Sequence, residues 1–243
     1  MVKRLKFDSD LSGLKVGKLT LSGVQDKSSL FKRSIKPYDL IYMFCGADPL
    51  LSNYLNDIDF VLADTGVLLK QQLKDLVFKK VGLKSDDFFQ AEDEKAVIAL
   101  GRDLSRESRF YQDPHTRKFG QRVYEQWVKN SILGTEADQI LVCRDSQRKV
   151  IGFLTVRFQD GVFKPVLVKI DEKHTGQGHG KALFTKFLNF VKKQNSNAVI
   201  VVKTQLSNTR SIRFYQSFGL CLADHSFVFH VYPNGFLQIQ EKS

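Results

Sequence analysis

A run of alternating glycines is the first feature of this sequence that could bind a ligand. Gly176, Gly178 and Gly180 follow a short apolar stretch and precede an apolar-rich segment that begins at Lys181. Glycine adopts backbone conformations that other residues avoid, so main-chain N–H groups can approach an anion, and the start of a helix adds a favourable dipole. The predicted chemistry is binding of a pyrophosphate by main-chain amides. A plain glycine-rich turn has the same composition and stays open as an alternative.

Three common nucleotide-binding loops do not fit this segment. No Gly-Lys-Ser or Gly-Lys-Thr follows the glycines at the spacing of a P-loop, and the segment does not follow the first strand as a Rossmann loop does. The other motifs of protein kinases are absent from the sequence. The loop therefore predicts a different phosphate-binding arrangement.

A second group of residues that could do chemistry follows the next apolar stretch. Asn208 precedes Tyr215 by seven residues, and Gly219 follows Tyr215 by four. A tyrosine hydroxyl can give a proton to a leaving group. An isolated tyrosine on a helix is more often a packing residue, so the meaning of Tyr215 depends on the elements around it.

The hydrophobic pattern places both groups between strands and helices. Apolar runs and period-two alternation predict strands at 140–144, 150–158, 166–170, 199–204 and 226–232, and helical spacing predicts helices at 92–104, 120–133, 181–193 and 209–217. The glycines thus join a strand to a helix, and Tyr215 lies on the helix after the next strand. Further strands are predicted at 14–22, 38–45 and 60–64, which favours a small α/β domain over 1–90 and a second domain over 91–243.

The charge of the chain favours an anionic partner without identifying it. The formal net charge is +11, with a sequence pI near 9.5. Nucleic acid, coenzyme A and nucleotide-linked sugars would all be attracted by such a field. No block of five or more Lys and Arg residues occurs, so we expect no dedicated nucleic-acid binding.

Other bulk features exclude several classes. No apolar run approaches the roughly 20 residues of a membrane-spanning helix, and the acidic residues after Phe7 interrupt any signal peptide, which predicts a cytoplasmic protein without a membrane partner. Cys45, Cys143 and Cys221 are widely spaced. They predict reduced thiols, with neither a disulfide framework nor a metal site.

Taken together, the two motifs resemble those of the GNAT acetyltransferases. Thr175 to Gly180 matches the family's Arg/Gln-x-x-Gly-x-Gly/Ala loop, and Asn208 to Leu220 matches its Asn-x-x-Ala-x-x-x-Tyr-x-x-x-Gly-Phe segment, with a helix and a strand between them. Thr175 replaces the usual Arg or Gln, Ser211 the usual Ala and Leu220 the usual Phe. The Thr175 replacement removes a long side chain but leaves the backbone cradle intact.

This resemblance implies a fold, an activity and a set of residues. The implied fold is a central mixed, splayed sheet flanked by helices, and the implied activity is transfer of acetyl from acetyl-CoA to an amine without a metal. Tyr215 would protonate the coenzyme A sulfur, and Asn208 would touch the cofactor near its thiol end. The cofactor's pantetheine arm would pair with Val168, Lys169 and Ile170. Its pyrophosphate would be held along the segment formed by Thr175, Gly176, Gln177, Gly178, His179, Gly180 and Lys181.

The acceptor amine is indicated by a narrower resemblance. Ser108-Arg109-Phe110, Asp113-Pro114, Tyr124-x-x-Trp127, Thr204-Gln205 and the leading Phe7-Asp8-Ser9-Asp10 are similar to the bacterial dTDP-fucosamine acetyltransferases. That family implies acetylation of a nucleotide-linked 4-amino-4,6-dideoxyhexose, an acceptor site lined by Arg109, Phe110 and Gln205, and a small N-terminal domain. It is also compatible with a homodimer.

Two other hypotheses stay open at this point. The acceptor could be another amine, such as a polyamine, an aminoglycoside or a protein lysine or N-terminus, or the chain could be a non-catalytic module that binds acyl-CoA or nucleic acid. The general base is also open: Asp171, Glu172 and His174 end the strand before the loop, where a base acting through water could lie. His225 and His230 are interpreted as strand histidines, and no partner is assigned to His115.

Overall fold

The computed structural model describes residues 2–21, 28–46, 55–56 and 58–236, and in them one mixed sheet has the strand order β1-β2-β3-β9-β4-β8-β7-β6-β5. Most neighbouring strands are antiparallel, but β2 is parallel to β3 and β7 is parallel to β8. The strands are β1 (Lys3–Arg4), β2 (Val16–Leu21), β3 (Leu40–Cys45), β4 (Asp59–Gln72), β5 (Gln139–Arg144), β6 (Val150–Gln159), β7 (Val162–Ile170), β8 (Val199–Gln205) and β9 (Cys221–Tyr232).

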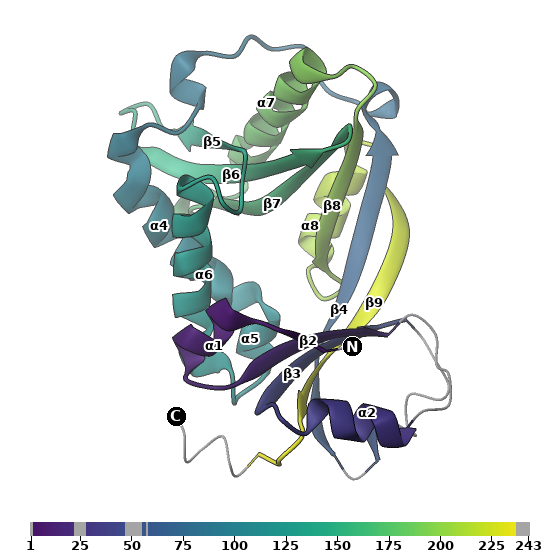
Figure 1. Ribbon diagram of the computed structural model, residues 1–243. Coiled ribbons are helices and arrows are strands. Elements are labelled where there is room, and N and C mark those ends of the chain that lie inside the picture. The colour runs from purple at the N-terminus through teal and green to yellow at the C-terminus, as the bar shows by residue number, and fades with distance from the viewer. Residues whose placement is uncertain (1, 22–27, 47–54, 57, 237–243) are drawn as a thin grey trace.

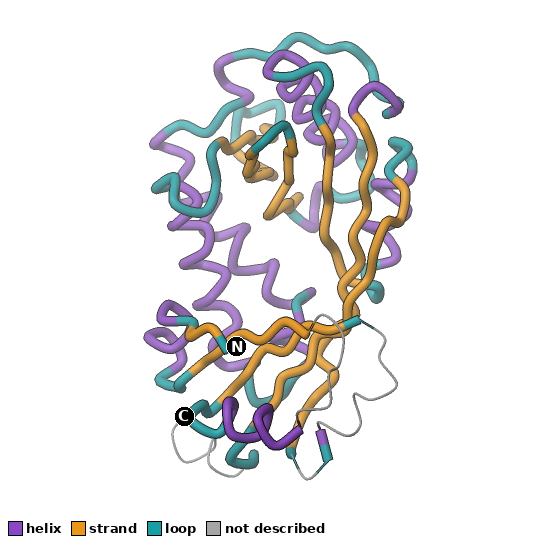
Figure 2. Tube along the Cα trace, turned by 45° about the vertical axis from the view of Figure 1, so that its right-hand side comes forward, coloured by secondary structure: helices purple, strands orange, loops and turns teal. Residues whose placement is uncertain are grey.

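Helices cover both faces of this sheet. They are α1 (Lys6–Ser12), α2 (Ser28–Ile35), α4 (Glu94–Asp103), α5 (Arg109–Gln112), α6 (Arg117–Ile132), α7 (His179–Gln194) and α8 (Thr209–Gln216). Figure 1 shows the sheet curving from β5–β7 at the top, past β8, β4 and β9, to β3 and β2 at the bottom, while α4, α6, α5 and α1 form a column on the opposite side. Figure 2 shows the same column facing the long strands. The predicted mixed, splayed sheet flanked by helices is confirmed.

Two apolar clusters fix α7 and α6 on opposite sides of the strands around the glycine loop. Phe184 and Phe187 of α7 are buried with Ile200 of β8 and with Tyr215 and Phe218 beyond it. Val128, on α6, is buried with Val97 of α4 and with residues of β5, β6 and β7. Burying such side chains is favourable by about 1.5–3 kcal/mol each. This packing holds β7 and α7, the two elements that the loop connects, in fixed positions.

The strand β4, from the N-terminal part of the sequence, lies in the sheet between two strands from the C-terminal part. It pairs with β8 from Gly66 to Gln72 and with β9 along almost its whole length. β9 in turn pairs with β3 from Phe227 to Val231. The sheet therefore passes continuously across the expected boundary near residue 90, and the division into domains of 1–90 and 91–243 stays a prediction.

Most of the expected elements are present, with some differences in extent. Strand 60–64 is the start of the much longer β4, and strand 226–232 is the end of β9. Of the strand expected at 14–22, Ser22 lies outside the described residues. Cys45 and Cys143 are buried and Cys221 is exposed, and none of these three described cysteines forms a disulfide. Among the described residues, no helix is both long and apolar enough to cross a membrane.

Candidate active site

The sheet opens between β7 and β8. These parallel strands pair only at their beginnings, where Val162 lies opposite Val199 and Phe163 opposite Ile200. Beyond this point β7 still pairs with β6 as far as Ile170, and β8 still pairs with β4. In the described part of the chain, the edge of β7 that faces β8 therefore has no strand partner from Lys164 onward, and an extended ligand can pair with it as an added strand would.

Gly152 of β6 allows β7 to lie close to β6 at the wide end of this opening. It lies opposite Ile170, and a Cβ there would lie 2.8 Å from the main-chain oxygen of Lys169 and 2.3 Å from Ile170 Cδ1. Since the oxygen belongs to the backbone, a side-chain rotation could not relieve the contact. Val168 and Ile170 pack on the core that includes α7, whereas Lys169 is buried and lies near Glu172.

The loop after β7 is built by its own hydrogen bonds. Asp171 Oδ1 accepts from the Lys173 N–H, Thr175 Oγ1 donates to the Asp171 carbonyl, and Gln177 Nε2 donates to the Lys173 carbonyl. Gly176 and Gly178 have φ values of +82° and +86°, the region that favours glycine. These hydrogen bonds and left-handed glycines fix the path of the loop from the end of β7 to the start of α7.

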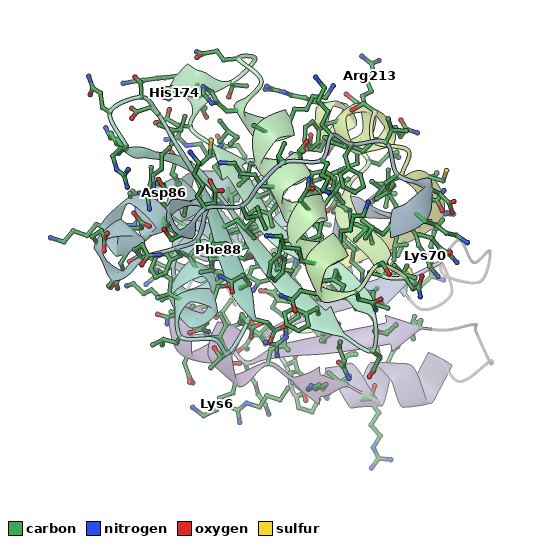
Figure 3. The ribbon with its side chains drawn as sticks, turned by 90° about the horizontal axis from the view of Figure 1, so that it is seen from above. Lys6, Lys70, Asp86, Phe88, His174 and Arg213 are labelled. Carbon is green, nitrogen blue, oxygen red and sulfur yellow. The ribbon has the colours of Figure 1, made fainter. Side chains whose placement is uncertain are left out.

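The beginning of α7 offers free amides. Gly178 is its N-cap, and the first bond of the helix runs from the Ala182 N–H to the Gly178 carbonyl. The N–H groups of His179, Gly180 and Lys181 therefore precede the first intrahelical bond, where the helix dipole favours an anion. A pyrophosphate suits this arrangement, with Lys181 adding a positive charge. His179 Nδ1 lies 3.9 Å from the Cys143 sulfur, and Figure 3 shows His174 at this end of the molecule.

Tyr215 is fixed by the start of its helix and by aromatic packing. Asn208 Oδ1 accepts from the Ser211 N–H at 3.0 Å, so this side chain caps α8 and orients the tyrosine seven residues later. The Tyr215 ring packs edge-on against Phe184, with centroids 5.2 Å apart. Burial raises the pKa of Tyr215 well above its usual value, so its hydroxyl stays protonated and could give a proton to a thiolate. Arg213 points outward from the same helix (Figure 3).

Arg109 and Gln205, expected to line the acceptor site, face the same side of the sheet. Gln205 lies opposite Gly66, which shares a strand face with Asp64 two residues earlier. Asp64 lies close enough to Arg109 for the guanidinium to affect its pKa. Phe110 is only 1% exposed and packs among the rings of Tyr42, Phe119, Tyr124 and His230, so the free protein holds it in the core beside the site.

Arg109 is the centre of a charged group that includes residues from the N-terminal strands. Its guanidinium stacks 4.9 Å from the centroid of the Tyr42 ring. Burial lowers the pKa of Lys18, and the positive charges of Lys203, Arg109 and Lys3 lower it further. Burial raises the pKa of Asp64 to about 6, and it also raises the pKa of Asp8, against the opposing effect of Arg109.

The sequence alone assigns no function to most of this group. Asp8 belongs to the short motif 7–10, Lys18 falls within the predicted strand 14–22, and His230 is interpreted as a strand residue. Their relevance depends on pairing between strands that are far apart in the sequence. The loop residues Asp171, Glu172 and His174 precede the amides at the start of α7, and Asp171 accepts a hydrogen bond within the loop.

Comparisons with known proteins agree with this geometry. Of the curated proteins, the spore coat polysaccharide biosynthesis protein SpsD of Bacillus subtilis is 26% identical over 144 residues, which cover 58% of this chain and 48% of that protein. The chain thus spans about half the length of the curated relative it matches.

Two solved structures share the fold. An acetyltransferase of the GNAT family from Colwellia psychrerythraea is 13% identical, with a TM-score of 0.53 over 86% of this chain and 75% of that one. A GCN5-related N-acetyltransferase from Sphaerobacter thermophilus is also 13% identical, with a TM-score of 0.50 over 79% of this chain and 59% of that one. The family model of the GNAT acetyltransferases matches residues 83–220, which include the opening, the glycine loop and Tyr215. On this match, the chain belongs to the GNAT acetyltransferase family.

Proposed function

We propose that this chain transfers acetyl from acetyl-CoA to the amino group of a nucleotide-linked 4-amino-4,6-dideoxyhexose. The observation that carries the acetyl-CoA part is the unpaired edge of β7, which leads straight to the free amides at the start of α7. An extended arm ending in a pyrophosphate matches both features, and Tyr215 lies on the helix after the other strand of the opening.

The residues of the chain have separable tasks in this reaction. The main chain of Val168 to Ile170 binds the extended arm and fixes the thioester, and the amides of residues 176–181 bind the pyrophosphate. Tyr215 keeps its proton until sulfur leaves the carbonyl carbon, and then donates it. Asn208 contributes by fixing α8, because its side chain caps that helix.

The nucleotide-linked sugar is supported by the charges on what we call the acceptor face, formed by Asp8, Lys18, Asp64, Arg109 and Lys203. Lys203 and Arg109 lie close enough to Lys18 to lower its pKa, and a diphosphate would relieve this repulsion. Asp8 and Asp64 beside them are suited to accept hydrogen bonds from sugar hydroxyls or from an ammonium group. The name of the relative SpsD points the same way, since it places that protein in polysaccharide biosynthesis.

The proposal is tested by acetyl transfer to a panel of amines. The purified full chain is incubated with acetyl-CoA and with dTDP- and UDP-linked 4-amino-4,6-dideoxyhexoses, polyamines, aminoglycosides and lysine peptides. Thiol release and product mass are followed together. We expect turnover with a nucleotide-linked amino sugar. Turnover with a different amine alone would overturn the proposed acceptor but would still support acetyl transfer from acetyl-CoA.

A matched pair of tyrosine variants tests the acid. Tyr215→Phe removes the hydroxyl from a buried ring, and Tyr111→Phe removes one from an exposed ring on α5. We expect Tyr215→Phe to lower kcat by about tenfold or more with unchanged affinity for coenzyme A, and Tyr111→Phe to leave kcat unaffected. Tight binding of acetyl-CoA without transfer to any amine would instead indicate a binding module.

A further inference from the structure

A buried carboxylate–histidine pair lies on the same face as Arg109. Asp113 follows α5, and His230 is on β9. Both side chains are fully buried, and Asp113 Oδ2 lies 2.6 Å from His230 Nδ1. Tyr232 Oη donates to the same carboxylate oxygen. The pair is thus formed between two segments that are 117 residues apart.

The hydrogen bonds determine which nitrogen of His230 is available. Burial acts to raise the pKa of Asp113, but the hydrogen bonds from His230 and Tyr232 outweigh it and lower the pKa, so the carboxylate is ionised. An ionised carboxylate only accepts hydrogen bonds, so Nδ1 of His230 carries the hydrogen. Burial lowers the pKa of His230. The ring is therefore neutral near pH 7, with a lone pair on Nε2.

The Nε2 atom has no partner for that lone pair. His230 Nε2 and Arg109 Nε are both buried without a hydrogen-bond partner among the described residues. Leaving such an atom without a partner in the protein interior is unfavourable. The two residues flank Tyr42, whose ring lies 4.9 Å from the His230 ring and 4.9 Å from the Arg109 guanidinium. A ligand that donates a hydrogen bond would satisfy the histidine.

We propose that His230, oriented by Asp113, is the general base that takes a proton from the acceptor ammonium. This rests on the proposed acetyl transfer to an amine. The N–H bond breaks with its electron pair kept by nitrogen, and the proton bonds to Nε2. The neutral amine forms the C–N bond, the C–S bond breaks with its pair on sulfur, and Tyr215 gives its proton to sulfur. Tyr215 regains a proton from the new amide nitrogen, and His230 releases its own to solvent after product leaves.

The surrounding charges suit this role. Arg109 on α5 acts on His230 directly, and Tyr42 on β3 and Tyr232 on β9 lie near Asp113. Asp8 on α1, Lys18 on β2 and Asp64 on β4 lie within electrostatic range of Arg109. The positive charge of Arg109 disfavours an ammonium nearby, which helps the proton to leave. Lys203, which affects Lys18, lies on the part of β8 that borders the opening. Asp64 lies opposite Val228, two residues before His230, so His230 is on the same face of the sheet as Asp64, as Gly66 and as the β8 neighbour of Gly66, Gln205.

Replacement of the histidine tests the proposal. His230→Gln keeps a polar side chain but removes the base, and His225→Gln is the control because His225 is exposed on the same strand. We expect His230→Gln to lower kcat about 100-fold or more with unchanged affinity for coenzyme A, and His225→Gln to stay within about twofold. The wild-type kcat should fall at acidic pH as Nε2 becomes protonated, and the variant should lose this acidic limb.

Two further measurements separate a catalytic from a structural role. Added imidazole should restore turnover to His230→Ala, since it can occupy the space left by the ring, whereas a merely destabilised protein would not respond. Long-range 1H–15N NMR of the wild type should show the hydrogen on Nδ1. A hydrogen on Nε2 would overturn the proposal even if every variant failed to fold.

The remaining outcomes distinguish the two proposals. If the wild type acetylates an amine and His230→Gln does so equally well, the base assignment is wrong and the proposed function stands. If Asp64→Asn alone removes the acidic limb, the base is Asp64. If the wild type acetylates no amine in the panel, the proposed function and the base assignment both fall.

Discussion

The glycine loop allows a prediction in which two neighbouring glycines respond oppositely to the same change. Gly178 has a φ of +86°, and a Cβ there would meet nothing within 4 Å. The cost of Gly178→Ala therefore comes from the left-handed backbone alone, about 1–2 kcal/mol for an L-residue. Gly180 needs no such backbone, and its Cβ would make ordinary contacts of 3.7 Å with Ile170 and 3.8 Å with Phe214.

The cost at Gly178 can appear in either of two measurements. If the loop keeps its conformation in the free protein, Gly178→Ala lowers the free energy of unfolding. If the loop relaxes, the cost appears on binding of coenzyme A, as an affinity about 5- to 30-fold weaker. The two losses should together equal about 1–2 kcal/mol. Gly180→Ala should leave the affinity unchanged and stabilise the protein by about 0.5–1 kcal/mol, because alanine favours helix.

Calorimetric titration with coenzyme A and thermal unfolding measure both quantities without any acceptor. The reasoning is refuted if Gly180→Ala weakens binding as much as Gly178→Ala does. That result would mean that the ligand occupies the space beside Gly180 and that the left-handed turn is not what positions the amides. No change in either quantity for Gly178→Ala would refute it as well.

Two further predictions concern the acceptor face. Burial raises the pKa of Asp64 from 3.8 to about 6, so the ionised side chain destabilises the folded protein above pH 6 and has no effect on its stability below about pH 4. Asp64→Asn should therefore raise the melting temperature at pH 8 but not at pH 4. An equal rise at both pH values would contradict this assignment. Lys203→Gln should raise KM for the nucleotide-linked sugar about tenfold at low salt, and by less at 0.5 M salt because of screening, whereas Lys70→Gln, on an exposed part of β4 (Figure 3), should leave KM unchanged.

The part of the site that the sequence predicted is the part encoded locally. The glycines, the strand before them and the helix after them are adjacent in the sequence, and Asn208 and Tyr215 belong to one short segment, as the N-cap of the next helix and a residue within it. A short motif carries both the element boundaries and the residues that need them. The apolar periodicity of α7 and α8 was also sufficient, because each helix buries one face against the same cluster.

The acceptor face could not be predicted in this way because its residues meet through long-range pairing. Tyr42 lies beside His230 only because β9 pairs with β3, and Asp64 lies on their side of the sheet because β9 also pairs with β4. The shift in register between Leu62 and Asp64 changes which side chains of β4 face that side. A single sequence contains no signal for a partner strand or for such a bulge.

The pairing of β4 with β8 and β9 also predicts what would happen if the chain were cut at the expected domain boundary. β4 precedes the expected boundary near residue 90, yet it pairs with β8 on the side away from β7 and so supports the strand that borders the opening. A chain that began at residue 91 would leave the edges of β8 and β9 without this partner, and exposed edges favour association with other chains. It would also lack Asp8, Lys18, Tyr42 and Asp64. The N-terminal segment thus contributes residues to the proposed acceptor site. Loss of acetyl transfer on its removal would not show which residue is responsible, whereas the single substitutions above would.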